Sequence, residues 1–347
     1  MSIPKENEEK YAITPKKRTE DRSLDFALRP SVFEEYVGQE SIKNNLKILI
    51  EAAKKRKEPV EHLLFYGPAG LGKTTLAYLV AKEMNAQIRV TSGPAIEKVG
   101  DLASILTNLS AGEILFIDEA HRLNKLIEEV LYPAMENRSL DIIIGKGPTA
   151  RAIQLELPPF SIIAATTRIA LLSSPLRSRF SGGLFRLDFY KKDDIEKIIT
   201  RSAKILGVGI EKEAVPLIAE RSRFTPRIAN RFLKRARDYA EVHGEGIITK
   251  NLAQKALELL EIDHMGLDSL DRKVLDTVIK KFGGGPVGLT TISASVQEEV
   301  DTIEEVSEPY LMQMGFLERT PRGRCATTRA YEHLGLTPPK TEQQKLI

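Results

Sequence analysis

Residues 67–75 place the strongest limit on the fold of this chain. They read Gly-Pro-Ala-Gly-Leu-Gly-Lys-Thr-Thr, directly after the apolar run His-Leu-Leu-Phe-Tyr and directly before an amphipathic pattern. The spacing Gly-x-x-x-x-Gly-Lys-Thr between a strand and a helix is typical of a loop whose backbone N–H groups bind phosphate oxygens. The positive end of the following helix adds to that attraction. The segment therefore predicts an α/β domain that binds a nucleoside triphosphate.

The loop residues have distinct predicted roles. Lys73 is expected to reach the β and γ phosphates, and the hydroxyl of Thr74 is expected to bind Mg²⁺. The alternative is a glycine-rich turn that binds nothing, which the strand-loop-helix context disfavours. The predicted nucleotide-binding residues of the loop are Gly67, Gly70, Gly72, Lys73, Thr74 and Thr75.

The pattern around this loop predicts a parallel sheet in a first domain at residues 23–190. Short apolar runs near residues 62–67, 87–93, 113–119, 160–167 and 182–190 alternate with helical patterns. Fully apolar strands joined by crossover helices are typical of a parallel sheet covered on both faces. Residues 140–157 break the alternation with two β-rich arms around Gly-Lys-Gly-Pro, so we expect an inserted hairpin there.

Two further domains are expected after residue 190. Helical patterns alone, separated by Gly, Pro and Thr, predict a small all-helical domain at residues 191–262. Three helices and a strand pair at 316–331 then predict a winged helix at residues 263–337. The polar ends at 1–22 and 338–347 are predicted to be tails.

Composition limits the kinds of partner. The 51 Lys+Arg and 48 Asp+Glu leave a net charge of +3, so any basic surface must be local. The single cysteine, Cys325, excludes an internal disulfide, and the five histidines lack zinc-ligand spacing. Because neither an apolar leader nor an apolar window of about twenty residues occurs, we expect a soluble, cytoplasmic protein without a membrane partner.

Polar residues follow two of the predicted strands. Asp118 and Glu119 come after Ile-Leu-Phe-Ile, and Thr167 comes after Ile-Ile-Ala-Ala-Thr. Parallel sheets bind ligands at the carboxyl ends of their strands. We therefore expect Asp118 to hold Mg²⁺ through water, Glu119 to orient and deprotonate the attacking water, and Thr167 to sense the γ-phosphate. The alternatives are a favourable helix start for the two acids and a helix cap for Thr167.

Arg177 and Arg179 lie in the segment Ser-Pro-Leu-Arg-Ser-Arg-Phe, which leaves the nucleotide edge of the predicted sheet. An arginine that completes a neighbouring subunit's phosphate site raises turnover by roughly 10³- to 10⁵-fold. Such a residue implies a ring of subunits. A surface salt bridge is the common alternative for an isolated arginine.

The predicted winged domain separates acidic from basic residues. Its third helical region would repel DNA phosphates, so its insertion into a groove is not expected. That region holds Glu298, Glu299, Asp301, Glu304, Glu305 and Glu308. The strand pair is instead expected to project arginines outward to phosphates, without reading bases; a solvated surface is the alternative. These arginines are Arg319, Arg322, Arg324 and Arg329.

The inserted hairpin carries an apolar run near its tip, formed by Ile142, Ile143 and Ile144. An exposed apolar tip predicts contact with a partner protein. The alternative is that these isoleucines pack on the chain's own sheet.

Taken in order, these segments resemble the AAA+ ATPases, and among them the RuvB family of Holliday-junction branch-migration motors. The resemblance runs from about residue 28 to residue 336. It is carried by LRPSVFEEYVGQ, HLLFYGPAGLGKTT, LFIDEAHRLN, LPPFSIIAATTR, SPLRSRF, TPRIANR and EPYLMQMGFLERTPRGR. It implies an ATP- and Mg²⁺-dependent DNA translocase that drives branch migration in recombination and repair.

The resemblance also implies roles for further residues. Thr167 would be the first sensor, Arg179 a finger acting on a neighbouring subunit, and Arg227 a second sensor. Arg319 and Arg324 are favoured as DNA contacts. Residues implied to lie near the nucleotide are Leu28, Arg29, Glu136, Asn137, Arg138 and Tyr190.

The partners implied by the resemblance are double-stranded DNA, four-way junctions and other proteins. The hairpin would dock onto RuvA, the tetramer that grips the junction, and RuvC would join the larger complex. The chain itself would form a hexameric ring. Two features depart from the family pattern: Ala69 stands in place of a proline, and the segment after Arg179 is one residue longer.

Two other classes of function compete with this one. Asp-Glu-Ala-His at 118–121 suggests a DEAH-type helicase, but such motors need a second nucleotide-fold domain, which the helical region after residue 190 does not supply. A clamp loader or an ATP-dependent transcription regulator with a winged domain is the other alternative. The acidic third helix argues against base readout by such a regulator.

Overall fold

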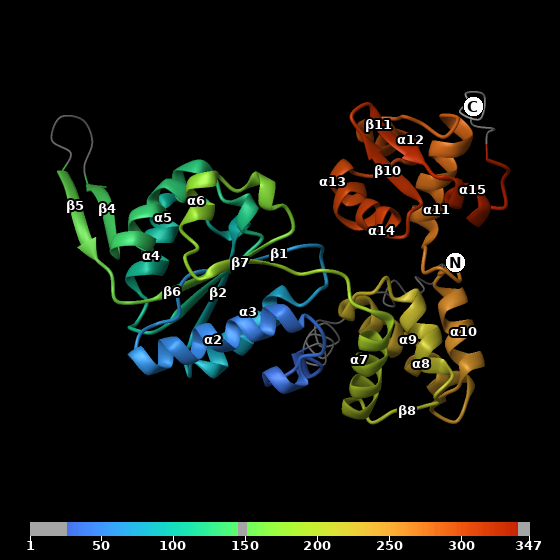
Figure 1. The fold of residues 1–347 in the computed structure, drawn as a ribbon, viewed down its shortest axis with the longest axis horizontal. Helices are drawn as coiled ribbons and strands as arrows, with labels where there is room; N and C mark the ends of the chain where they lie inside the picture. The colour runs from blue at the N-terminus through green and yellow to red at the C-terminus, as the bar shows by residue number, and fades with distance from the viewer. Residues whose placement is uncertain (1–25, 145–150, 339–347) are drawn as a thin grey trace, which may run out of the picture.

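The computed structural model describes residues 26–144 and 151–338, which form three successive parts (Figure 1). We call them the sheet domain, the lid and the winged domain. The succession of a parallel-sheet domain, a helical lid and a winged helix confirms the predicted fold class. Within the described ranges, helices long and apolar enough to cross a bilayer are absent.

The described part of the sheet domain has five parallel strands in the order β2-β3-β6-β1-β7. Their bounds are β1 (Leu63–Tyr66), β2 (Ile88–Ser92), β3 (Ile114–Asp118), β6 (Ser161–Thr166) and β7 (Gly183–Arg186). Leu63 and Phe65 face one core while Leu64 faces the other, because successive strand residues point to opposite faces. All six residues of β6 are buried, as expected for the middle strand of a covered parallel sheet.

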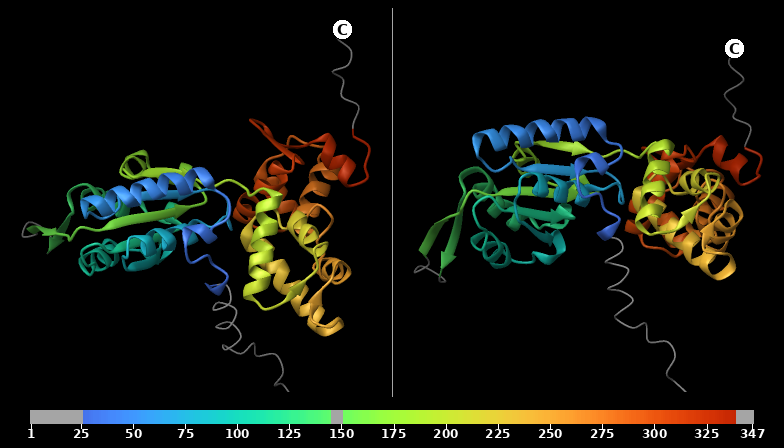
Figure 2. Two further views of the ribbon diagram at one scale, coloured as in Figure 1. Left: turned by 60° about the horizontal axis from the view of Figure 1, so that its bottom comes forward. Right: turned by 90° about the horizontal axis from the view of Figure 1, so that it is seen from below.

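Helices cover both faces of this sheet (Figure 2). α2 (Glu40–Arg56) and α3 (Lys73–Glu83) pack on one face, and α4 (Val99–Thr107) and α5 (Lys125–Asn137) pack on the other. α6 (Ser174–Ser178) follows β6. Because the strands are parallel, the segments after β1, β3 and β6 meet at one edge of the sheet.

The predicted hairpin is present and extends away from the central sheet (Figure 1). β4 (Ser139–Ile144) pairs antiparallel with β5 (Arg151–Glu156), with Ser139 opposite Glu156. The adjoining Leu140 and Leu157 are buried in the sheet domain and anchor its base. The side chains of the run 142–144 lie outside the described part of the structure, so the partner role of these isoleucines remains a prediction.

The lid consists mainly of helices α7 (Lys192–Ile205), α8 (Ala214–Arg221), α9 (Pro226–His243) and α10 (Lys250–Leu259). One short parallel strand pair, β8 (Gly209–Ile210) with β9 (Ile247–Ile248), joins them and was not predicted, because two-residue strands carry no periodic signal. The apolar faces of these helices continue the core on the α2–α3 face of the sheet.

The winged domain begins with α11 (Ser269–Asp276), which continues as a π-helical turn at Thr277–Lys281, and α12 (Leu289–Val296). A third helical stretch runs through α13 (Val300–Thr302), a π-helical turn (Ile303–Ser307) and α14 (Glu308–Gln313). β10 (Leu317–Thr320) and β11 (Gly323–Ala326) form the wing. The predicted strand pair ends earlier than expected, because the Thr327 side chain caps α15 (Thr328–His333) by accepting from Ala330 N–H.

A buried arginine joins the lid to the winged domain. The side chain of Arg223 is 4% exposed, and its Nη2 lies 2.5 Å from Asp268 and 2.6 Å from Asp271. Its Nε donates to the carbonyl of Gly266, and its guanidinium lies 5.3 Å from the ring centroid of Tyr310. Burial outweighs the attraction of Arg223 and raises the pKa of Asp271 to about 6.

Candidate nucleotide site

The loop at residues 67–72 connects β1 to α3 at the carboxyl edge of the sheet. Two of its glycines occupy positions where a side chain would clash with neighbouring atoms. A Cβ on Gly72 would lie 2.7 Å from the hydroxyl of Tyr36, and Gly72 has a φ of +99°. A Cβ on Gly67, whose φ is +136°, would lie 2.4 Å from the carbonyl oxygen of Leu187. The backbone of this loop therefore lies close to its surroundings in a conformation that favours glycine.

Lys73 lies inside the loop rather than in solvent. Its side chain donates to the carbonyls of Gly67 (2.7 Å) and Pro68 (2.8 Å). The residue is 8% exposed, and burial lowers the pKa of Lys73 to about 8. A buried cation whose hydrogen bonds to the described residues go to neutral carbonyls is suited to receive an anion such as a triphosphate.

Asp118 lies beside Thr74. Asp118 ends β3, and its carboxylate accepts from the Thr74 hydroxyl at 3.4 Å and from Glu119 N–H at 3.0 Å. A hydroxyl and a carboxylate are oxygen donors of the kind that Mg²⁺ prefers, so these two residues fit the predicted metal. The exposed Glu119 has a φ of +48°, which is rare for a residue with a side chain and common at functional sites.

Two neighbouring threonines at the end of β6 contact different groups. Thr166 is buried, and its hydroxyl lies 3.0 Å from Nδ1 of His121. Burial lowers the pKa of His121. The predicted sensor Thr167 instead donates to the Glu305 carboxylate of the winged domain at 3.4 Å. The structure therefore places Thr167 at the nucleotide edge of the sheet and, at the same time, against the third domain.

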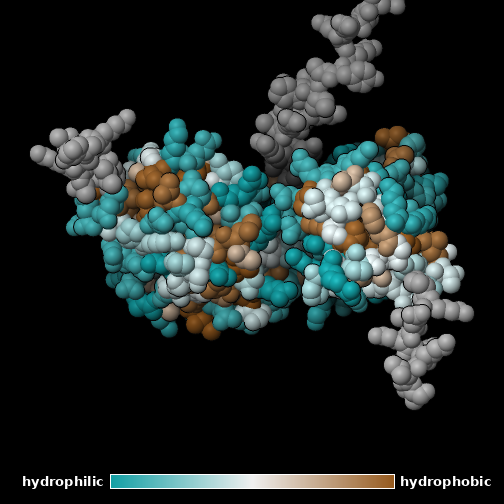
Figure 3. Space-filling model, turned by 90° about the horizontal axis from the view of Figure 1, so that it is seen from above, coloured by the Kyte–Doolittle hydropathy of each residue, from teal (hydrophilic) through white to brown (hydrophobic). Residues whose placement is uncertain are grey.

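Arg168 connects the sheet domain to the winged domain, which the sequence did not predict. Its guanidinium pairs with Asp301 (3.3 Å), Glu304 (2.7 Å) and Glu305 (3.7 Å) of the winged domain. Hydrophilic residues line much of the boundary between the sheet domain and the other two parts (Figure 3). Half of the acidic run that was expected to avoid DNA therefore faces an arginine next to the nucleotide edge. In the sequence, the sole sign of such a partner was the negative charge of the run, which had no assigned role.

Residues predicted to border the base and ribose lie around the same loop. The ring of Tyr190 is buried, and its hydroxyl lies 3.1 Å from the carbonyl of Leu71 and 3.0 Å from the hydroxyl of Tyr36. Arg227, at the start of α9, donates its N–H to Gly70 at 3.4 Å. The structure thus brings the lid residue Arg227, and Tyr190 just before the first lid helix, to the phosphate-binding loop.

A lid arginine also holds the N-terminal residues of the site. Arg201 on α7 donates to the carbonyls of Leu28 (2.8 Å) and Arg29 (3.4 Å) and pairs with Glu35 at 2.8 Å. Leu28 is buried, and the guanidinium of Arg29 lies 5.6 Å from the ring centroid of Tyr78 on α3. Arg201 was missed because one basic residue on an amphipathic helix carries no signal for its partner.

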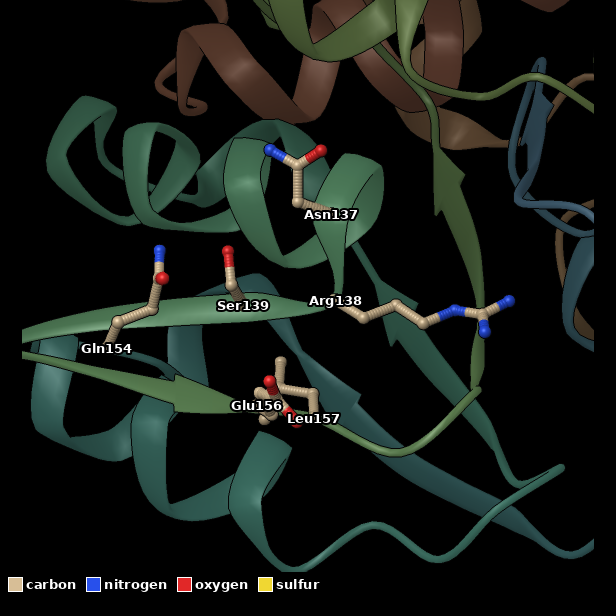
Figure 4. Close-up of a pocket in the computed structure, with 6 residues that line it drawn as sticks. All are labelled: Asn137, Arg138, Ser139, Gln154, Glu156 and Leu157. Atoms are coloured by element: carbon tan, nitrogen blue, oxygen red, sulfur yellow. The ribbon is translucent and has the colours of Figure 1, made fainter.

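Arg179 and Glu136 belong to a separate group on α5 and α6. They pair with each other at 3.2 Å, and the contacts of Arg179 also include Tyr132 and the carbonyl of Pro175. Asn137 and Arg138 line a polar pocket at the base of the hairpin, where Arg138 points away from the neighbouring side chains (Figure 4). Arg179 and Glu136 therefore pair beside α6, whereas Asn137 and Arg138 border the hairpin.

The wing presents only some of its predicted arginines. Arg319 and Arg322 are exposed on the wing, whereas the exposed Arg329 lies on α15 and not on the strand pair as predicted. The expectation that Arg324 also projects outward is wrong: its side chain is 12% exposed and forms a bidentate pair with Glu308, at 2.9 and 3.1 Å. The cause is the neighbouring Glu308, which is 4% exposed and needs a counter-ion.

Comparison with known proteins connects this geometry to a family. Three family models match: the Holliday junction DNA helicase RuvB P-loop domain at residues 28–186, the RuvB AAA lid domain at 190–263, and the RuvB C-terminal winged helix domain at 264–335. The chain is 57% identical over 329 residues to the Holliday junction branch migration complex subunit RuvB of Dehalococcoides mccartyi (strain CBDB1), covering 95% of this chain and 94% of that relative.

Solved structures agree with this match. The Thermotoga maritima RuvB Holliday junction branch migration motor superposes with a TM-score of 0.83 at 49% identity, covering 90% of this chain and 100% of that one. A single-residue mutant of the same protein gives a TM-score of 0.84 at 49% identity, covering 90% and 99%. The chain therefore belongs to the RuvB family of P-loop AAA+ ATPases.

Proposed function

We propose that this chain is the ATP-hydrolysing motor of Holliday-junction branch migration, working on duplex DNA as a hexameric ring with RuvA and, in the larger complex, RuvC. One observation carries the proposal. Lys73, Thr74 and Asp118 converge at the carboxyl edge of the sheet in a chain that matches the RuvB family through all three domains. A clamp loader or a transcription regulator would share the first domain but is disfavoured by the family match of the winged domain.

The chain's own residues account for triphosphate binding and hydrolysis. Loop amides and Lys73 would hold the phosphates, with the ammonium turning from the Gly67 and Pro68 carbonyls to phosphate oxygens. Glu119, exposed beyond the end of β3, would orient the attacking water and accept its proton. Thr74 and Asp118 would hold Mg²⁺, which neutralises phosphate charge when bound. Arg227 would report nucleotide state to the lid, since its own helix α9 starts at the loop.

The finger role of Arg179 requires a second subunit. In one chain the guanidinium lies in the α5–α6 group rather than at the phosphate-binding loop. We propose that it completes the nucleotide site of the next subunit in the ring, where a cation stabilises the charge of the transferring phosphoryl group. The hairpin tip would bind RuvA through Ile142, Ile143 and Ile144.

The direct test uses the purified full chain on a synthetic four-way junction, with and without RuvA and ATP. We expect the junction to be converted into two duplex products only when ATP and RuvA are both present. A linear duplex of the same sequence serves as the control substrate for ATP turnover. If ATP is hydrolysed but the junction never moves with RuvA present, the chain is a different AAA+ ATPase.

Wing arginines are expected to differ in their effect on DNA binding. Replacement of the exposed Arg319 or Arg322 by alanine should weaken binding about equally for unrelated duplexes and reduce the salt dependence by roughly one counterion. Arg324→Ala differs from these two variants in that it should lower thermal stability, because it leaves the buried Glu308 without its counter-ion. Fluorescence anisotropy on two unrelated duplexes over a salt series measures the first effect. A loss confined to one sequence would favour a transcription regulator.

A further inference from the structure

The guanidinium of Arg179 is held on three sides. Its carbon lies 4.3 Å from the ring centroid of Tyr132 on α5. One terminal nitrogen donates to the carbonyl of Pro175 at 2.7 Å, and the other lies 3.2 Å from Glu136. Its Nε is buried and, among the described residues, lacks a hydrogen-bond partner. The side chain is only 19% exposed, which is unusual for an arginine awaiting a ligand in solvent.

The backbone that carries Arg179 is anchored as well. Leu176 and Phe180, on either side of it, are both buried in the core on the α5 face of the sheet. α6 is further fixed at its start by Ser173, whose hydroxyl accepts from the N–H of Leu176 at 3.2 Å. The backbone position of Arg179 is therefore fixed, and the direction of its guanidinium depends on the side chains that it contacts.

Tyr132 is tied to the same helix. Its hydroxyl lies 2.9 Å from the hydroxyl of Ser173, the residue that caps α6. The ring under the guanidinium is therefore connected to the helix from which Arg179 leaves. Tyr132 lies on α5, which packs its buried side against the sheet, so the ring is part of a rigid support.

The position of this guanidinium over the Tyr132 ring suits a residue that binds phosphate. A guanidinium lying over an aromatic face is attracted by the ring quadrupole. Its N–H bonds lie in the guanidinium plane, so a phosphate oxygen that replaces the Glu136 carboxylate would approach along that plane. Contact with the ring also reduces the number of directions open to a long side chain, and a misplacement of about 1 Å is worth roughly 10²-fold in rate.

We infer that Tyr132 is a positioning residue, whose ring aims the guanidinium of Arg179 at the phosphates of the neighbouring subunit. This inference rests on the proposed trans role of Arg179. Glu136 pairs with the guanidinium within the same subunit, and an incoming phosphate replaces that carboxylate. Tyr132 keeps contact with the face of the guanidinium throughout, because a phosphate approaches its edge.

The first test compares three substitutions of one residue. Tyr132→Leu and Tyr132→Met remove the aromatic face, and Tyr132→Phe keeps it while deleting the hydroxyl that contacts Ser173. We expect kcat for ATP to fall about 10- to 100-fold in the first two, with nucleotide affinity within about twofold of wild type. Tyr132→Phe should retain kcat within about threefold. Equal losses in Tyr132→Phe and Tyr132→Met, or an affinity loss that accounts for the rate, would overturn the inference. Thermal melting identifies a variant that fails to fold, in which case the other non-aromatic variant decides.

The second test separates the finger from the rest of the site. Tyr132→Leu subunits have an intact phosphate-binding loop, and Glu119→Gln subunits have an intact finger. Mixing the two should restore turnover above the sum of the separate samples, because intact fingers then face intact loops. Arg179→Ala mixed with Glu119→Gln is the reference. If the reference recovers and the Tyr132→Leu mixture does not, Tyr132 affects the nucleotide site of its own subunit rather than that of its neighbour, and the inference is wrong. If the reference also fails, the trans role of Arg179 is wrong.

Discussion

Replacing Lys73 by alanine is expected to abolish ATP turnover, by at least about 10²- to 10³-fold, while the fold stays intact. The loss of turnover follows from removing the one side-chain cation buried in the phosphate-binding loop. The fold should tolerate the change, because the hydrogen bonds of this lysine to described residues go to two backbone carbonyls that water can solvate. Its pKa, lowered to about 8 by burial, shows that folding disfavours the charged form. Phosphate release and thermal melting measure the two parts of the prediction.

Lys82 supplies a matched control for this substitution. It lies on the same helix α3, is exposed, and is outside the loop. Lys82→Ala should leave both turnover and melting temperature close to wild type, since surface substitutions usually change stability by less than about 0.5 kcal/mol. If turnover by Lys73→Ala stays within about twofold of the Lys82→Ala value, the proposed nucleotide site is wrong.

The second large effect concerns the junction of the lid and the winged domain. Arg223→Leu should destabilise that junction by about 3–5 kcal/mol, because it leaves the buried Asp271 and its neighbour Asp268 without their shared counter-ion. Arg235→Ala is the control: its pair with Asp238 is exposed and should contribute less than about 1 kcal/mol. Urea unfolding followed by circular dichroism measures both. Adding Asp271→Asn to Arg223→Leu should recover part of the loss by removing the unpaired charge.

The same junction has an expected pH dependence. The pKa of Asp271 is raised from 3.8 to about 6. Since the folded pKa lies above the unfolded one, the stability linked to this group is fully present below pH 3.8 and is lost as the pH rises through about 6. The penalty of Arg223→Leu should therefore be larger at pH 8 than at pH 5, where a protonated Asp271 needs no counter-ion. A penalty that is equal at both pH values would show that Asp271 is not the group left unpaired.

Local pattern was enough to predict much of this molecule. The five core strands, the inserted hairpin and the loop at 67–72 all lie where the sequence predicts them. Each of these features depends on residues close together in the chain: an apolar run that can be buried on both faces, a turn rich in glycine, or a helix that starts at Lys73. The ends of the elements were less predictable, as the wing shows, because a single capping residue such as Thr327 decides whether a helix replaces a strand.

Only the tertiary structure decided which charged groups meet. Charge alone predicts that the acidic run 298–308 is unsuited to DNA, but it does not identify Arg168 as the partner of Asp301, 133 residues away. It also grouped Arg324 with the exposed wing arginines, although Glu308 on a different element holds it inward. The support of Arg179 by Tyr132 depends in the same way on the packing of α6 against α5. The physical reason is that a sequence specifies the sign of each charge and the faces of each helix, whereas the partner of a side chain is set by how whole elements pack.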